Sequence, residues 1–168
     1  KTKRLPRMTR DQEETYEAIG QEIAFAKAEL GAGVKLPRSG GVFISLREGD
    51  KAAMVEPARV LVMLGFKILA TAGTATVFED AGVPVTRVNK VFEGRPHIVD
   101  LMKNGEVQLI FNTTEGRQSH LDSYSIRRTA LDMRIPCYTT ASAARAAILS
   151  LRRIDEGALE PVALQTYS

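Results

Sequence analysis

The sequence has no tryptophan and a single cysteine, and only 6% of its 168 residues are aromatic. One cysteine, Cys137, excludes an internal disulfide and a cysteine-based metal site. The scarcity of aromatic side chains argues against a stacking platform for single-stranded nucleic acid, and the formal net charge of +3 adds little support for such a partner. No apolar run reaches membrane-spanning length, and no signal-peptide pattern is present. We therefore expect a soluble, cytoplasmic protein that binds neither membrane nor nucleic acid.

Side chains suited to catalysis or metal binding are few. The two histidines, His97 and His120, lie far apart, and neither has a second ligand four residues further on, so we expect no metal. His97, beside a proline, is expected to pack or to cap a helix. Cys137 lies in an apolar stretch typical of a buried strand, which favours a core thiol over a nucleophile. Asp100 is an exposed candidate base without an evident partner. We therefore expect no catalytic residue and no cofactor.

The composition changes twice along the chain. Residues 14–30 have the apolar periodicity of a helix, and residues 31–41 form a linker rich in glycine, proline and charge. We therefore divide the chain into an N-terminal arm with its linker, 1–40, a main domain, 41–155, and a C-terminal tail, 156–168.

The main domain alternates between strand and helix patterns. Such an alternation with short links predicts an α/β protein of three layers, α/β/α, with a mostly parallel five-stranded sheet of the Rossmann-like type. The expected N-caps of three helices are Asp50, Thr74 and either Asp122 or Ser123. The expected strands are residues 42–46, 66–70, 84–88, 107–111 and 136–138, and the expected helices are 51–64, 74–81, 96–103, about 122–133 and 142–154.

Small hydroxyl residues and glycine follow the second expected strand, in the sequence Thr71-Ala72-Gly73-Thr74. Glycine lets a backbone approach closely, hydroxyls donate, and the next helix turns its amide end toward an anion, so this turn predicts a phosphate site. Ser45 and Lys51 follow the first strand. A lysine in the first turn of a helix is disfavoured by the helix dipole, which an anion in the same site would relieve. The alternatives are a surface lysine and an ordinary turn with Thr74 as its cap.

Polar side chains also follow the third and fourth expected strands. Lys90 is placed to reach a phosphate or a base carbonyl, or else is solvated. Asn112 and Thr114, in Asn112-Thr113-Thr114-Glu115-Gly116, suit a sugar or a base edge. A turn motif that caps local backbone groups is the alternative for this pair. Because ligands bind outside the carboxyl ends of parallel strands, we expect one pocket for a phosphorylated ligand at this edge.

Five segments in order resemble a known family, namely residues 45–51, 70–75, 88–98, 110–117 and 126–130. They are similar to the C-terminal regulatory domain of the large subunit of carbamoyl phosphate synthase. The resemblance runs from about residue 24 to residue 152, and residues 24–31 resemble the end of the preceding synthetase domain.

The resemblance implies a fold like that of methylglyoxal synthase and an allosteric role. The domain would bind a nucleoside monophosphate, the inhibitor UMP or the activator IMP, and would not be an enzyme by itself. It would be part of a ligase that makes carbamoyl phosphate for the pyrimidine and arginine pathways, with the synthetase domains of the same subunit and the small glutaminase subunit as partners. A homo-oligomer is left open. The implied phosphate ligands are Ser45, Lys51, Thr71, Thr74 and Thr114, and the implied nucleoside contacts are Lys90 and Asn112.

Two enzymes are the alternatives. A methylglyoxal synthase shares the phosphate loop but has an acidic residue in a glycine-rich stretch after the third strand, where this chain has Arg95 in Glu93-Gly94-Arg95-Pro96. The cyclohydrolase half of the purine-synthesis enzyme shares the serine–lysine and threonine loops, but its further catalytic sequence is absent here. Both comparisons favour the regulatory domain.

Overall fold

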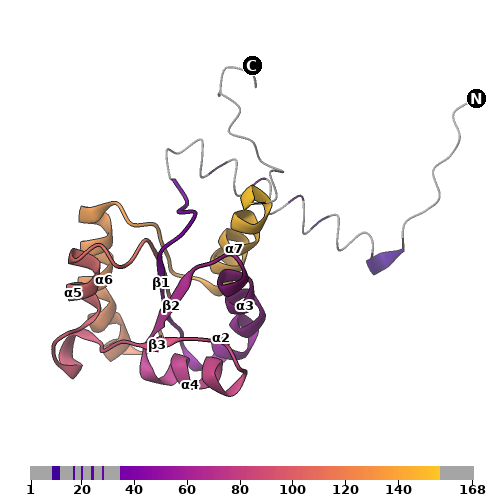
Figure 1. Ribbon diagram of the computed structural model, residues 1–168. Coiled ribbons are helices and arrows are strands. Elements are labelled where there is room, and N and C mark those ends of the chain that lie inside the picture. Colours follow the sequence, from indigo (N-terminus) through magenta and orange to yellow (C-terminus); the bar gives the residue numbers. More distant parts are fainter. Residues whose placement is uncertain are drawn as a thin grey trace, which may run out of the picture.

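The computed structural model describes residues 35–155 and the separate positions 9–11, 17, 20, 24 and 28 (Figure 1). The helix expected over residues 14–30 falls largely outside the described residues, and the tail over 156–168 falls entirely outside them.

A five-stranded sheet forms the centre of the domain. Its strands are β1 (Gly41–Ser45), β2 (Lys67–Ala70), β3 (Thr86–Arg87), β4 (Leu109–Asn112) and β5 (Cys137–Tyr138). They lie in the order β3-β2-β1-β4-β5, and every neighbouring pair is parallel. The strand order reverses between β1 and β4, and such a switch point is where open α/β sheets bind ligands.

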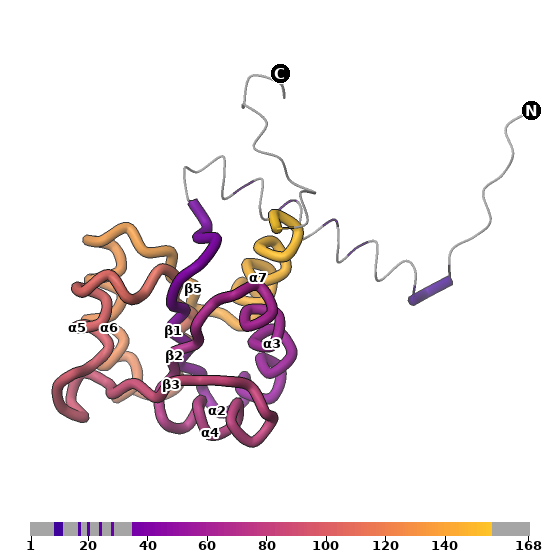
Figure 2. Tube along the Cα trace, in the orientation of Figure 1, coloured from indigo at the N-terminus to yellow at the C-terminus, as the bar shows by residue number. Residues whose placement is uncertain are grey.

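Helices cover both faces of the sheet. The helices α3 (Val55–Met63), α4 (Ala72–Asp80) and α7 (Ala141–Asp155) lie on one face, and α5 (Ile98–Lys103) and α6 (Arg117–Met133) lie on the other (Figures 1 and 2). The expected three-layer α/β/α architecture with its five-stranded parallel sheet is confirmed.

Each face of the sheet has its own apolar core, because successive side chains of a strand point to opposite sides. Ile44 and Phe111 pack with α3 and α7, whereas Phe43 and Ile110 pack with α5 and α6. All four side chains are fully buried. Strands buried on both faces read as continuous hydrophobic runs, and this is the pattern that made β1 and β4 recognisable in the sequence.

The segment after β1 is more broken than the single helix expected over residues 51–64. It forms α2 (Glu48–Lys51), a 3₁₀ turn (Ala52–Met54) and then α3. Pro57 lies in the first turn of α3, where its missing N–H would have no partner within the helix. The break just before it agrees with the shortening that this proline predicts.

The caps expected at Asp50 and at Asp122 or Ser123 are wrong. Helix α2 begins before Asp50, whose carboxylate instead pairs with Arg47 Nε at 2.8 Å. Helix α6 begins at Arg117, after Gly116, so Asp122 and Ser123 lie inside it. Gly116 has φ of 84°, a conformation that favours glycine. Helix α6 therefore begins several residues before its first apolar residue, which is where an apolar pattern would place its start.

Candidate ligand-binding site

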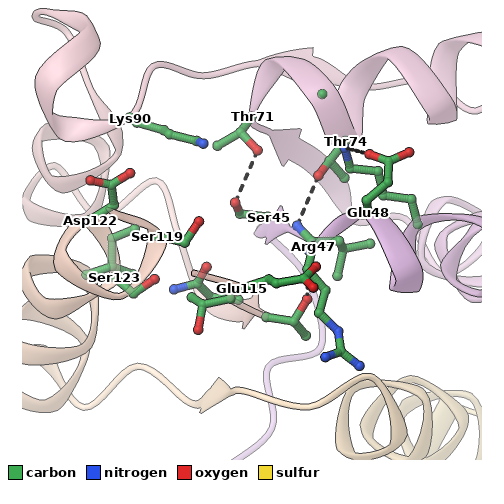
Figure 3. A pocket seen from close by; sticks show the side chains of 17 residues that line it. Ser45, Arg47, Glu48, Thr71, Thr74, Lys90, Glu115, Ser119, Asp122 and Ser123 are labelled. Atoms are coloured by element: carbon green, nitrogen blue, oxygen red, sulfur yellow. Dashed lines mark hydrogen bonds and ion pairs between the residues drawn. The ribbon is translucent and has the colours of Figure 1, made fainter. Parts of the chain in front are cut away.

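A cavity of about 270 Å³ opens at the switch point, between the carboxyl ends of β1, β2 and β4 and the first turns of α6 (Figure 3). The structure brings all seven side chains singled out in the sequence to this cavity, although their binding roles stay predictions. These residues are Ser45, Lys51, Thr71, Thr74, Lys90, Asn112 and Thr114.

The start of α4 forms one end of the cavity. The Thr71 hydroxyl donates to Ser45 Oγ at 3.1 Å. The first helical hydrogen bond runs from the Ala75 N–H to the Thr71 carbonyl at 2.8 Å, so the amide groups just before it belong to the positive end of the helix. A Cβ added to Gly73 would lie 2.9 Å from Lys51 Nζ. The glycine thus leaves room for this ammonium group above the amide end, and the arrangement suits an anion.

Lys51 does not lie in the first turn of a long helix, as the sequence indicated. It is the last residue of the four-residue helix α2, so the argument from an unfavourable dipole does not apply. Its ammonium group contacts Glu48 Oε2 at 2.7 Å, and its side chain is only 14% exposed whereas that of Glu48 is 84% exposed. An anion in the cavity could therefore compete with an exposed carboxylate for a largely buried cation.

Two threonines fix the loop that follows β1. Thr74 Oγ1 accepts the Leu46 N–H and Thr113 Oγ1 accepts the Arg47 N–H, both at 3.0 Å. The expectation that Thr74 caps α4 is therefore wrong: Thr71 occupies the cap position, and no side-chain cap bond forms there. A hydroxyl that accepts one bond keeps its own proton as a donor, so Thr74 can still serve a ligand.

Asn112 ends β4 directly beside Ser45, its register partner on β1. The residue is only 2% exposed, and its Nδ2 has no hydrogen-bond partner among the described residues. Buried amides are rarely left unpaired, so a ligand acceptor in the cavity would satisfy this one. Thr114, two residues on, lies 3.1 Å from His120 Nδ1 through its hydroxyl.

The wall formed by α6 was missed in the sequence. Ser119, Asp122, Ser123 and Ile126 line the cavity from this helix, and Figure 3 shows the first three facing it. Their spacing places them on one helical face, so a helix begun at residue 117 would have shown this polar stripe. The sequence interpretation treated Asp122 or Ser123 as a cap instead.

The cavity is lined by equal numbers of formal charges of each sign. The cations are Arg47, Lys51 and Lys90, and the carboxylates are Glu48, Glu115 and Asp122. Arg47 is held by Asp50, whose hydrogen bond and charge raise the pKa of the guanidinium. Lys90 forms no ion pair within the described residues, and its ammonium group points toward Thr71 in Figure 3. Lys90 is therefore the cation most available to a ligand.

The other residues considered as catalytic or metal-binding candidates lie outside the cavity. His97 is buried at the N-cap position of α5, which confirms the expected packing or capping, and Asp100 accepts its backbone N–H at 3.1 Å. Cys137 is half-buried, and burial raises the pKa of its thiol. Within residues 35–155 and the isolated described positions, no helix combines the length and apolar character of a membrane span, and no three His, Cys, Asp or Glu side chains form a potential metal site.

Comparison with known proteins defines the class of the domain. Residues 53–139 match the model of the MGS-like domain family, and the chain belongs to this family. It is 60% identical over 129 residues to the carbamoyl phosphate synthase large chain of Pseudomonas aeruginosa, covering 77% of this chain and 12% of that one. The corresponding large chain of Rhizobium meliloti is 46% identical over 157 residues, covering 91% and 14%.

These matches confirm the resemblance inferred from the five motifs. The chain spans only 12% to 14% of the length of these relatives. The family match lies inside the expected main domain, 41–155, while the division of the chain into three parts stays a prediction.

Proposed function

We propose that the cavity binds a nucleoside monophosphate, UMP or IMP, and that the domain is a non-catalytic allosteric module of a carbamoyl phosphate synthase large chain. The observation that carries the proposal is the convergence of seven residues, from four separate strand ends and the segment after β1, on one cavity at the switch point.

The chemistry of the cavity supports a phosphate at one end and a nucleoside at the other. Lys51, Thr71 and the amide end of α4 provide positive charge and donors. Lys90 and the unpaired amide of Asn112 provide donors for the rest of the ligand. The volume of about 270 Å³ lies just below the range of roughly 300–1,000 Å³ typical of ligand pockets, which favours a mononucleotide over a dinucleotide.

The similarity to carbamoyl phosphate synthase large chains supports the wider assignment. In this proposal the domain acts in the cytoplasm with the synthetase domains of such a large chain and with the small glutaminase subunit. Binding of the nucleotide would regulate the ligase activity that supplies carbamoyl phosphate to pyrimidine and arginine synthesis.

A lyase of the methylglyoxal synthase type is the second candidate, because three carboxylates line the cavity and could take a proton from bound dihydroxyacetone phosphate. We favour the regulatory role because Glu48 is held by Lys51, and Asp122 accepts a hydrogen bond from Gln118. Arg95, which occupies the position expected for the catalytic acid, is not among the residues that line the cavity.

Thermal melting with UMP, IMP, inorganic phosphate or dihydroxyacetone phosphate tests the proposal. A ligand at a hundredfold excess over its dissociation constant stabilises the folded state by roughly 2.7 kcal/mol, so the nucleotides should raise the melting temperature clearly and inorganic phosphate weakly. A parallel assay should detect no methylglyoxal. Absence of any nucleotide effect at millimolar concentration would contradict the proposal, and saturable methylglyoxal production would favour the lyase.

A further inference from the structure

Large apolar side chains lie on the solvent face of α6, opposite the face that lines the cavity. Leu121, Tyr124 and Leu131 are 61%, 64% and 81% exposed. They follow one another at spacings of three and seven residues, so they share one side of the helix. Apolar side chains aligned in this way, rather than scattered singly, are a common mark of an interaction surface.

The same face carries positive charge. Arg117 and Arg128 are exposed, lie on the same side as the apolar residues, and form no ion pair with the residues that the structure describes. Asp132 is the one acidic residue on this side. We call the set Arg117, Leu121, Tyr124, Arg128 and Leu131 the outer stripe of α6.

We propose that the outer stripe docks an acidic protein segment that presents apolar side chains at helical spacing, as an amphipathic helix does. Apolar anchors on such a helix would pack on Leu121, Tyr124 and Leu131, and its carboxylates would pair with the two arginines. A second copy of this chain fits less well. A two-fold contact would place the arginines of one stripe near those of the other, and each stripe has only one aspartate to offset their repulsion.

The position of α6 links this surface to the cavity. Ser119, Asp122, Ser123 and Ile126 face the cavity from the inner side of the helix that carries the outer stripe on its other side. A ligand and a partner would thus contact opposite sides of one helix. If the ligand shifts this helix, linkage requires each of the two to change the affinity for the other by the same factor. This coupling rests on the proposed function, whereas the docking surface does not.

A synthetic acidic helix tests the docking surface. The probe is a fluorescent peptide of about 20 residues, long enough to form a helix in water, with leucines at helical spacing and glutamates beside them. Its control has lysine in place of every glutamate. We expect the acidic peptide to bind the 168-residue chain and the lysine peptide to bind at least tenfold more weakly in fluorescence anisotropy.

Variants of the chain locate the binding. Two variants change the outer stripe: the double variant Leu121→Ser, Tyr124→Ser and the single variant Arg128→Glu. Each should weaken binding of the acidic peptide about tenfold or more. The melting temperature should stay unchanged because these side chains are exposed. Met63→Ser, which removes an 84% exposed side chain of α3 on the other face of the sheet, and Lys67→Glu, at the start of β2, are the matched controls and should bind as the parent does.

Three results would overturn the proposal: no binding of the acidic peptide, equal binding by the stripe variants, or a dimer in sedimentation that Leu121→Ser abolishes. For the coupling, IMP should change the affinity for the peptide several-fold in the parent but not in Lys51→Ala, which should still bind the peptide. UMP is used in the same way if it is the nucleotide that binds. Equal affinity for the peptide with and without the bound nucleotide would overturn the coupling, and failure to bind either UMP or IMP would count against the proposed function alone.

Discussion

The hydroxyl oxygen of Thr74 accepts a hydrogen bond from the backbone N–H of Leu46 at 3.0 Å, and both residues are buried. This bond ties the first turn of α4 to the loop that follows β1. Because Ser45, Arg47 and Lys51 lie in or next to that loop, the bond positions several lining residues of the cavity at once.

Replacing Thr74 by valine should destabilise the fold. The change keeps the shape but leaves the Leu46 N–H buried without an acceptor, which costs about 1–3 kcal/mol. Thr74→Ser should retain most of the stability. The control is Thr76→Val, which removes an exposed hydroxyl that donates to the Ala72 carbonyl. Urea unfolding measures the difference, and a Thr74→Val variant that unfolds at the parent concentration of urea would contradict the positioning role.

Lys51→Ala should separate ligand binding from stability. Loss of a charge-assisted contact to phosphate costs on the order of 1.5–3 kcal/mol, or about tenfold to a hundredfold in affinity. The pair with the exposed Glu48 contributes at most about 1 kcal/mol to folding. Calorimetry should therefore show weak nucleotide binding, and melting without ligand should stay near the parent temperature.

Glu48→Gln is the matched control for Lys51→Ala. It removes the same ion pair but keeps the ammonium group and releases it to the cavity. We expect UMP and IMP to bind this variant at least as tightly as they bind the parent. Equal loss of binding in both variants would mean that the ion pair itself, rather than the cation, is required.

The Cys137 thiol should react slowly. Burial raises its pKa, although the charge of Arg127 acts in the opposite direction. Because the thiolate is the nucleophile, alkylation by iodoacetamide at neutral pH should be slower in the folded chain than in urea, and should accelerate as the pH rises. Equal rates in the folded and unfolded chain would show that the thiol is accessible and unshifted.

The pair of Glu79 and Arg87 should give a small pH-dependent contribution to stability. Hydrogen bonds from Arg87 lower the pKa of Glu79 below its usual 4.5. A carboxylate with a lowered folded pKa contributes stability above its unfolded pKa and loses it as the pH falls through the folded pKa. The melting difference between the parent and Arg87→Gln should therefore be present at neutral pH and vanish in acid. A difference that persists once Glu79 is protonated would point to packing instead.

The sheet was predictable because its strands are buried on both faces. Continuous runs such as those around Phe43 and Ile110 mark β1 and β4, and the alternation with helices implies a parallel sheet. The short edge strand β3 was expected over residues 84–88 but is formed by Thr86–Arg87 alone. Both residues of this edge strand are exposed, so no apolar pattern in the sequence marks where the strand begins and ends.

The candidate site was predictable at the strand ends and not beyond them. Hydroxyl and amide residues after apolar runs located Ser45, Thr71 and Asn112, because parallel strands bring their carboxyl ends to one edge. The α6 wall was missed because its start depends on the backbone conformation of Gly116, which an apolar pattern does not report. The cap role given to Thr74 failed because its acceptor is used by Leu46, which is distant in sequence.

Isothermal titration calorimetry with UMP, IMP and dihydroxyacetone phosphate tests the central claim most directly. We expect one nucleoside monophosphate to bind at a single site per chain, to bind tighter than dihydroxyacetone phosphate, and to lose about tenfold or more in affinity in Lys51→Ala. Binding of neither nucleotide, or nucleotide binding that Lys51→Ala leaves unchanged, would contradict the assignment of this cavity as an effector site.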